Sequence, residues 1–117
     1  MKLALAQINY HIGNFDANVE SILNEIEKAK TQQVDLIVFA ELAICGYPPR
    51  DFLKVADFIE ICIASVEKVA KSCIGIAAIV GAPSQNNGET GKRLHNSAYF
   101  LQNGKIESVH NKHLLPT

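Results

Sequence analysis

Apolar and polar residues follow two different spacings along the chain. Short apolar runs with the length and composition of β-strands occupy residues 3–9, 34–41 and 74–83. Between the first two runs, apolar residues recur every three or four positions behind a polar start, as on one face of an α-helix. The members of that stripe are Val19, Ile22, Leu23, Ile26 and Ala29.

A second helical stretch follows the break at Pro48-Pro49, with Asp51 in position to cap it. Its apolar stripe is wide, so we expect this helix to be mostly buried. The stripe consists of Phe52, Val55, Ile59, Cys62, Val66, Val69 and Cys73, widened by Leu53, Ala56, Ile63 and Ala70.

The last part of the chain predicts a β-hairpin. Asn103-Gly104 stands between two alternating runs within residues 94–113, and this dipeptide is typical of a type I′ turn, in which both central residues need positive φ. The run at 34–41 is continuously apolar, as in strands that are buried on both faces, so we expect a sheet covered on two sides. The fold class predicted is α/β, ordered βαβαβ and followed by a hairpin, in one domain over residues 1–117.

Composition narrows the function classes. The chain has 117 residues, of which 48% are hydrophobic and 20% charged, with eleven basic and twelve acidic side chains and a net charge of −1. This balance is that of a soluble globular protein and predicts no nucleic-acid or membrane partner, but a small neutral or anionic ligand. Without a signal peptide, a membrane span or a disulfide pattern, the sequence predicts a cytoplasmic location.

Glu41 is the first candidate for chemistry. It ends the apolar run at 34–41, and open α/β sheets bind ligands at the carboxyl ends of their strands. Pro48 and Pro49 stiffen the loop that follows, as a binding site on a loop requires. A solvated charge at the end of a strand, followed by an ordinary turn, explains the same residues.

Other polar residues carry weaker signals. Lys112 follows the hairpin, where a lone lysine is usually a surface charge, and the spacing of His95, His110 and His113 fits no common metal site. Cys45 lies on a loop, where a spacing of four does not bring it to Glu41, and is better interpreted as a packed small residue. The other two cysteines, Cys62 and Cys73, fall on the helical stripe and are predicted to lie in the core.

Several longer segments together resemble the opening of a nitrilase-superfamily carbon–nitrogen hydrolase. These are residues 1–26, 35–53, 80–106 and 110–117, which cover almost the whole chain. Within that superfamily, "ELAICGYPPRDFL" and "KHLLPT" are similar to the glutamine-hydrolysing domain of glutamine-dependent NAD synthetases, and "GYPPRD" favours this branch.

The resemblance implies an αββα sandwich with a Glu–Lys–Cys triad. It places Glu41 at the general base, Lys112 at the lysine and Tyr47 in the glutamine pocket, although Tyr47 beside Pro48 is also explained by packing alone. No residue here matches the nucleophilic cysteine, so we expect the chain to be the N-terminal portion of such a domain, ending before the nucleophile and inactive by itself. The resemblance also implies that these residues hold no cofactor. ATP, Mg²⁺ and deamido-NAD would bind in a separate synthetase domain, and the protein would be a homo-oligomer.

Three hypotheses remain open from the sequence. The first is part of a glutamine-dependent NAD synthetase, in which ammonia released from glutamine amidates deamido-NAD. The second is part of a free-standing nitrilase-type amidase acting on a small ω-amide or carbamoyl compound. The third is a non-enzymatic α/β binding module, in which Glu41 and Lys112 are ordinary surface charges.

Overall fold

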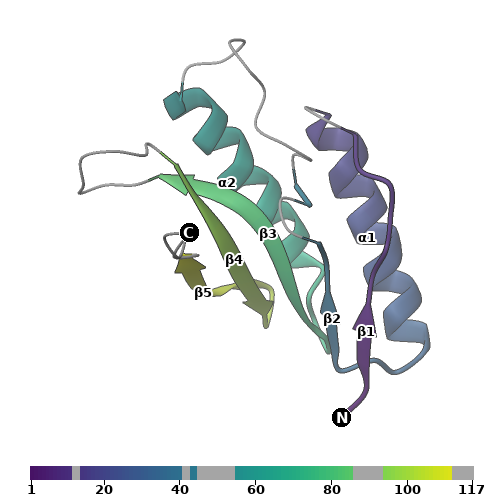
Figure 1. Ribbon diagram of the computed structural model, residues 1–117. Helices are drawn as coiled ribbons and strands as arrows, with labels where there is room; N and C mark the ends of the chain where they lie inside the picture. The colour runs from purple at the N-terminus through teal and green to yellow at the C-terminus, as the bar shows by residue number, and fades with distance from the viewer. Residues whose placement is uncertain (12–13, 41–42, 45–54, 86–93, 112–117) are drawn as a thin grey trace, which may run out of the picture.

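The computed structural model describes residues 1–11, 14–40, 43–44, 55–85 and 94–111, which form one α/β layer pair (Figure 1). The elements, in chain order, are β1 (Leu3–Leu5), α1 (Phe15–Thr31), β2 (Leu36–Val38), α2 (Val55–Lys71), β3 (Ala77–Gln85), β4 (Leu94–Gln102) and β5 (Lys105–Asn111). This order confirms the predicted βαβαβ unit with a following hairpin. The cap predicted at Asp51 lies outside the described residues.

The five strands form one mixed sheet in the order β1-β2-β3-β4-β5. The first three strands are parallel, whereas β4 is antiparallel to both β3 and β5. β1 is shorter than the predicted run of 3–9, although the Ala6 N–H still donates to the Val38 carbonyl at 2.9 Å. The pairing between β1 and β2 ends there, because β2 ends at Val38.

Local signals explain where α1 begins and ends. The Asn14 side chain accepts a hydrogen bond from the Ala17 N–H at 3.1 Å, which satisfies one free donor of the first turn. Asp16 lies in the first turn and Lys28 and Lys30 in the last, as the helix dipole favours. The buried face carries four apolar residues and one amide, namely Val19, Ile22, Ile26, Ala29 and Asn18.

The face of α2 that packs on the sheet is buried as predicted, but the helix as a whole is not. Ile59, Cys62, Val66, Val69 and Ala70 are all buried. Ile61 and Ile63 are 36% and 39% exposed, and their polar neighbours on the same side are exposed as well. The expectation of a mostly buried helix is therefore wrong: α2 is an amphipathic helix that covers the sheet with one face.

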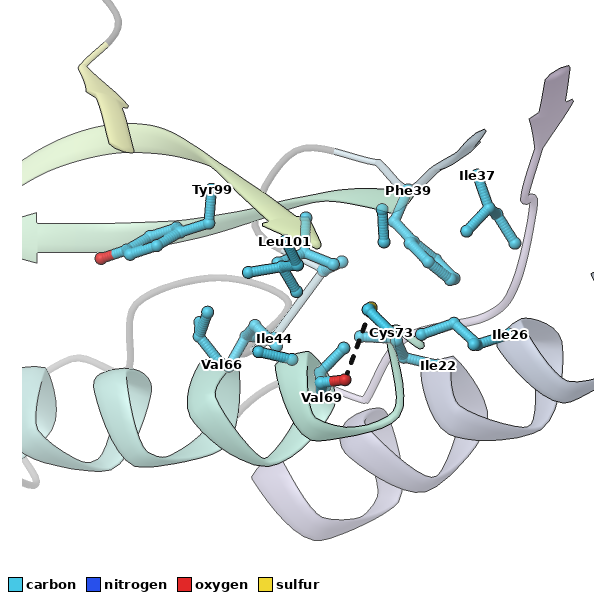
Figure 2. Close-up of a cluster of buried hydrophobic side chains, with 14 of the residues drawn as sticks. Ile22, Ile26, Ile37, Phe39, Ile44, Val66, Val69, Cys73, Tyr99 and Leu101 are labelled. Carbon is cyan, nitrogen blue, oxygen red and sulfur yellow. Dashed lines mark hydrogen bonds between the residues drawn. The ribbon is translucent and has the colours of Figure 1, made fainter. Parts of the chain in front are cut away.

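The core fills the space between the two helices and one face of the sheet (Figure 2). Side chains from both layers are fully buried there, since α1, α2 and the central strands each contribute large apolar residues. The largest are Ile22, Ile26, Ile44, Leu101, Val66, Val69 and Val80. This packing holds the sheet rigid, so the loops at the ends of its strands start from fixed positions.

The opposite face of the sheet is open in the described residues. Strand register aligns Leu5, Val38, Ile79 and Phe100 in one row on this face. Leu5 is 72% exposed, and the other three are half-buried. The described residues therefore do not provide the expected cover on two sides, because α1 and α2 both lie on the same side of the sheet (Figure 1).

The β4–β5 hairpin turns at Asn103-Gly104, as predicted. Both residues have positive φ, 58° and 78°, which is the backbone geometry of a type I′ turn. The Gly104 N–H donates to the Cys73 carbonyl at 3.1 Å, which attaches the turn to the segment just after α2. A Cβ at Gly104 would lie 3.1 Å from Ile74 Cδ1, so glycine suits both the backbone and the space.

Candidate active site

The predicted site residues Glu41, Lys112 and Tyr47 lie outside the described residues, as does Cys45. The structure describes their neighbours, which are Ala40 and Ala43 beside Glu41 and Asn111 before Lys112. These neighbours show which parts of the fold carry the candidate site.

β2 precedes Glu41 and β5 precedes Lys112. Both strands end on the same side of the sheet, where the parallel strands have their carboxyl ends. β5 is antiparallel to β4, which is antiparallel to β3, so β5 runs in the same direction as β2 and β3. Asn111 pairs with Ser97, which pairs with Ala82, whereas the end of β2 at Val38 pairs with Ile79. The described residues that precede Glu41 and Lys112 thus reach the same end of the sheet, the end where parallel sheets bind ligands, with β3 and β4 between them.

The segment around Glu41 is attached to β3 on both sides. The Phe39 N–H donates to the Ile79 carbonyl at 2.9 Å, and the Ile44 N–H donates to the Gly81 carbonyl at 3.3 Å. Ala43 and Ile44 are completely buried, and Figure 2 shows Ile44 in the core beside Val66. Phe39 and Ile44, which flank position 41 in the sequence, are therefore both hydrogen-bonded to β3 and buried in the core.

Asn18 on α1 was not singled out from the sequence, yet it contacts the same segment. Its amide nitrogen donates to the Ile44 carbonyl at 3.1 Å and to the His11 carbonyl at 2.8 Å. Its amide oxygen accepts the His11 N–H at 2.7 Å. A signal was available, because Asn18 precedes Ile22 and Ile26 at steps of four and is therefore an amide on the buried stripe.

Tyr10 lies at the same edge of the sheet, after β1. Its hydroxyl is buried, and within the described part of the chain it has no hydrogen-bond partner. Burial raises the pKa of the Tyr10 phenol; the nearby backbone of Ala40 offsets part of this shift, and Glu25 adds to it. The phenol therefore stays protonated at neutral pH next to the end of β2.

Near the candidate lysine position, the side chain of Ser97 on β4 is hydrogen-bonded to the end of β5. Its buried hydroxyl donates to Asn111 Oδ1 at 2.8 Å across the β4–β5 pair. On β5 itself, the Ser108 hydroxyl and His110 Nε2 lie 3.1 Å apart in an exposed pair. The residue before Lys112 is thus fixed to β4 by a side-chain hydrogen bond as well as by the strand ladder.

The two described cysteines are unsuited to nucleophilic attack. Cys62 and Cys73 are both fully buried, which confirms the prediction that they lie in the core. Burial raises the pKa of the Cys73 thiol, an effect that Ser72 and then Lys30 partly oppose, and its Sγ lies 3.6 Å from the Val69 carbonyl (Figure 2). A protonated, enclosed thiol cannot serve as the attacking thiolate.

Neither a metal site nor a membrane span is found in the described part of the chain. Among these residues, His, Cys, Asp and Glu do not gather in groups of three or more that could hold a metal ion. None of the helices that the structure describes is long and apolar enough to cross a membrane.

Comparison with known proteins identifies the family. The family model for carbon-nitrogen hydrolase matches residues 2–117. The chain therefore belongs to the carbon–nitrogen hydrolase family, as the motifs predicted.

Within this family, the curated relatives point to one branch. Glutamine-dependent NAD(+) synthetases of Xylella fastidiosa, Acinetobacter baylyi and Synechocystis sp. are 34%, 36% and 37% identical to this chain over 98–99% of its length. The chain spans about a fifth of the length of these relatives, 20–21%.

Solved structures agree with the fold. A glutamine-dependent NAD(+) synthetase from Cytophaga hutchinsonii superposes with a TM-score of 0.81 at 28% identity, over 96% of this chain and 19% of that one. The enzyme from Acinetobacter baumannii, solved with ADP, gives 0.80 at 34% identity, over 97% of this chain and 21% of that one. An amidase from Nesterenkonia sp. gives 0.76 at 21% identity over all of this chain and 44% of that one, which shows the shared fold.

Proposed function

We propose that this chain forms the first part of the glutaminase domain of a glutamine-dependent NAD synthetase. The observation that carries the proposal is the match of almost the whole chain to these synthetases at 34–37% identity in the relatives named above. The end of the sheet that β2 and β5 both reach supports the site, because the strands before Glu41 and Lys112 run in the same direction and end on the same side, with β3 and β4 between them.

In this proposal, Glu41 is the general base of glutamine hydrolysis. It takes the proton of a cysteine thiol supplied by another part of the domain, and the thiolate attacks the amide carbon of glutamine. Lys112 stabilises the oxyanion of the tetrahedral intermediate, an interaction worth about 3 kcal/mol per donor in other enzymes. Tyr47 lines the glutamine pocket.

The remaining steps return the proton and release the products. The carbon–nitrogen bond breaks as Glu41 passes its proton to the leaving amine, so ammonia departs and a glutamyl thioester remains. Glu41 then activates a water that hydrolyses the thioester to glutamate and free thiol. The ammonia amidates deamido-NAD in a synthetase domain that uses ATP and Mg²⁺. The same proposal includes a soluble, cytoplasmic protein that forms a homo-oligomer.

Two variants of the full-length protein test the roles. We expect Glu41→Gln and Lys112→Ala to lower glutamine-driven NAD synthesis at least about 100-fold, as loss of a base or an oxyanion donor does in other enzymes. Synthesis from free ammonia should stay at the wild-type rate. Glu20→Gln, which removes an exposed carboxylate from α1, is the matched control and should leave both rates unchanged.

The competing hypotheses predict different results. A free-standing amidase, whose fold the Nesterenkonia enzyme shares, would hydrolyse small amides without any ammonia-dependent NAD synthesis. A binding module would show no amide hydrolysis at all. Wild-type turnover of glutamine in Glu41→Gln would contradict the assignment of the base.

A further inference from the structure

We propose that Asn18 is a positioning residue for the candidate base Glu41, an inference that rests on the function proposed above. Asn18 is fully buried on α1 and forms three hydrogen bonds, two donated by Nδ2 and one accepted by Oδ1. All three partners are backbone groups of loops at the edge of the sheet that carries the candidate site. The amide thus connects α1 to that edge.

The two loops held by Asn18 follow adjacent parallel strands. His11 lies after β1, and Ile44 lies shortly after β2. Bonds of 2.7 and 2.8 Å to the N–H and C=O of His11 orient the amide, which leaves its second N–H directed at the Ile44 carbonyl at 3.1 Å. The loop after β1 therefore orients the Asn18 amide, and this amide in turn holds the loop after β2.

Ile44 is held from two sides. Its N–H donates to Gly81 of β3 at 3.3 Å, and its C=O accepts from Asn18 of α1 at 3.1 Å. Upstream, the Phe39 N–H donates to Ile79 of β3 at 2.9 Å. Position 41 lies between these fixed residues, so the placement of Ile44 limits the reach of the short segment that contains Glu41.

An apolar side chain could not replace this function. Leucine at position 18 would fill the buried volume of Asn18, but it would leave the buried carbonyl of Ile44 without its partner on α1. The segment around Ile44 would then keep its backbone hydrogen bond to β3 but lose the bond from α1. Misplacement of a catalytic group by about 1 Å can cost about 100-fold in rate, so a modest shift of this loop would be visible in turnover.

The test compares Asn18→Ala, Asn18→Asp and Ile26→Ala in the full-length protein. Asn18→Asp keeps the acceptor for the His11 N–H but removes both donors. Ile26→Ala removes a fully buried side chain two turns along the same helix and touches neither loop bond, so it controls for general loss of stability. Thermal unfolding of all three is measured beside the kinetics.

We expect both Asn18 variants to lower kcat of glutamine-driven synthesis about 100-fold while KM for glutamine changes less than about threefold. Ammonia-driven synthesis should be unchanged. The rate at which iodoacetamide inactivates the glutaminase should fall in parallel, because a displaced base forms less thiolate. Ile26→Ala should keep glutamine-driven kcat within about threefold of wild type even where its Tm is lower.

Three results would overturn the positioning role. These are glutamine-driven kcat within about threefold of wild type in both Asn18 variants, an equal loss in Ile26→Ala, or unfolding of both Asn18 variants at the assay temperature. The Glu41→Gln variant separates this inference from the proposed function. If Glu41→Gln is inactive with glutamine while the Asn18 variants are active, the base assignment stands and the positioning role fails.

Discussion

The hydroxyl of Ser97 on β4 donates a 2.8 Å hydrogen bond to Oδ1 of Asn111, the last residue of β5. Ser97 is 5% exposed whereas Asn111 is exposed, so this bond is partly buried. It joins the candidate lysine segment to the central part of the sheet, because Ser97 in turn pairs with Ala82 of β3. The end of β5 is thus held by a side chain as well as by backbone pairing.

We expect Ser97→Ala to affect glutamine-driven turnover as well as stability. Loss of the hydrogen bond to Asn111 should cost about 1 kcal/mol in the free energy of unfolding, since Oδ1 loses a shielded donor. Urea unfolding and glutamine-driven kcat measure the two effects. Ser108→Ala, in the exposed pair with His110 on β5, is the control and should change stability by less than about 0.5 kcal/mol.

Tyr10→Phe should stabilise the protein. The buried hydroxyl forms no hydrogen bond of ordinary geometry within the described residues, and the Ala40 backbone only partly offsets its burial, so its removal should relieve a desolvation cost of up to about 1 kcal/mol at neutral pH. Because burial raises the pKa of the phenol in the folded state, the unfolded state ionises first, so the wild type loses stability as pH rises above about pH 10.

The pH dependence supplies the check on Tyr10. Free energies of unfolding measured between pH 7 and 11 should show that the advantage of the phenylalanine variant widens above about pH 10. A variant less stable than wild type at pH 7 would show that the hydroxyl makes a favourable interaction and would contradict the prediction.

Cys62 and Cys73 should be dispensable for chemistry. Each is fully buried, and burial raises the pKa of the Cys73 thiol. We therefore expect Cys62→Ala and Cys73→Ala to keep glutamine-driven turnover within about twofold of wild type, with a stability loss of about 1 kcal/mol. Steady-state kinetics and thermal unfolding test this, and loss of glutaminase activity in a stably folded variant would disprove it.

The open face of the sheet should be covered in the full-length protein. Strands β1–β3 are parallel, and all-parallel sheets almost always have both faces covered. On the face opposite the helices, Leu5, Val38, Ile79 and Phe100 form an apolar row. We expect the cover to be the rest of the carbon–nitrogen hydrolase domain. Leu5→Lys should then cost at least about 2 kcal/mol, although Leu5 is 72% exposed here.

Ile63→Lys is the matched control for the open face. Ile63 is 39% exposed on the outward side of α2, and its replacement by lysine should cost less than about 0.5 kcal/mol. Chemical unfolding of the full-length Leu5→Lys and Ile63→Lys variants compares the open face of the sheet with the outward side of α2. Equal, small effects would show that the row containing Leu5 stays in contact with water.

Much of the fold could be predicted because local rules govern it. The helical stripe containing Ile22 and Ile26 and the positive-φ turn at Asn103-Gly104 are properties of neighbouring residues, and both were found where the pattern placed them. The expectation that α2 is mostly buried was wrong, because the sequence shows that Ile63 is apolar but not whether another layer packs against it. The roles of Glu41, Lys112 and Tyr47 stay predictions that the variants above can decide.

The sequence by itself determined the element order, the hairpin and, through its motifs, the carbon–nitrogen hydrolase family. Only the tertiary structure decided that β2 and β5 end at one edge of the sheet and that Asn18 joins the loops after β1 and β2. The physical reason is the distance along the sequence over which each kind of interaction acts. Periodicity and turn chemistry act over a few residues, whereas Asn18 meets Ile44 across 26 positions through the packing of α1 on the sheet.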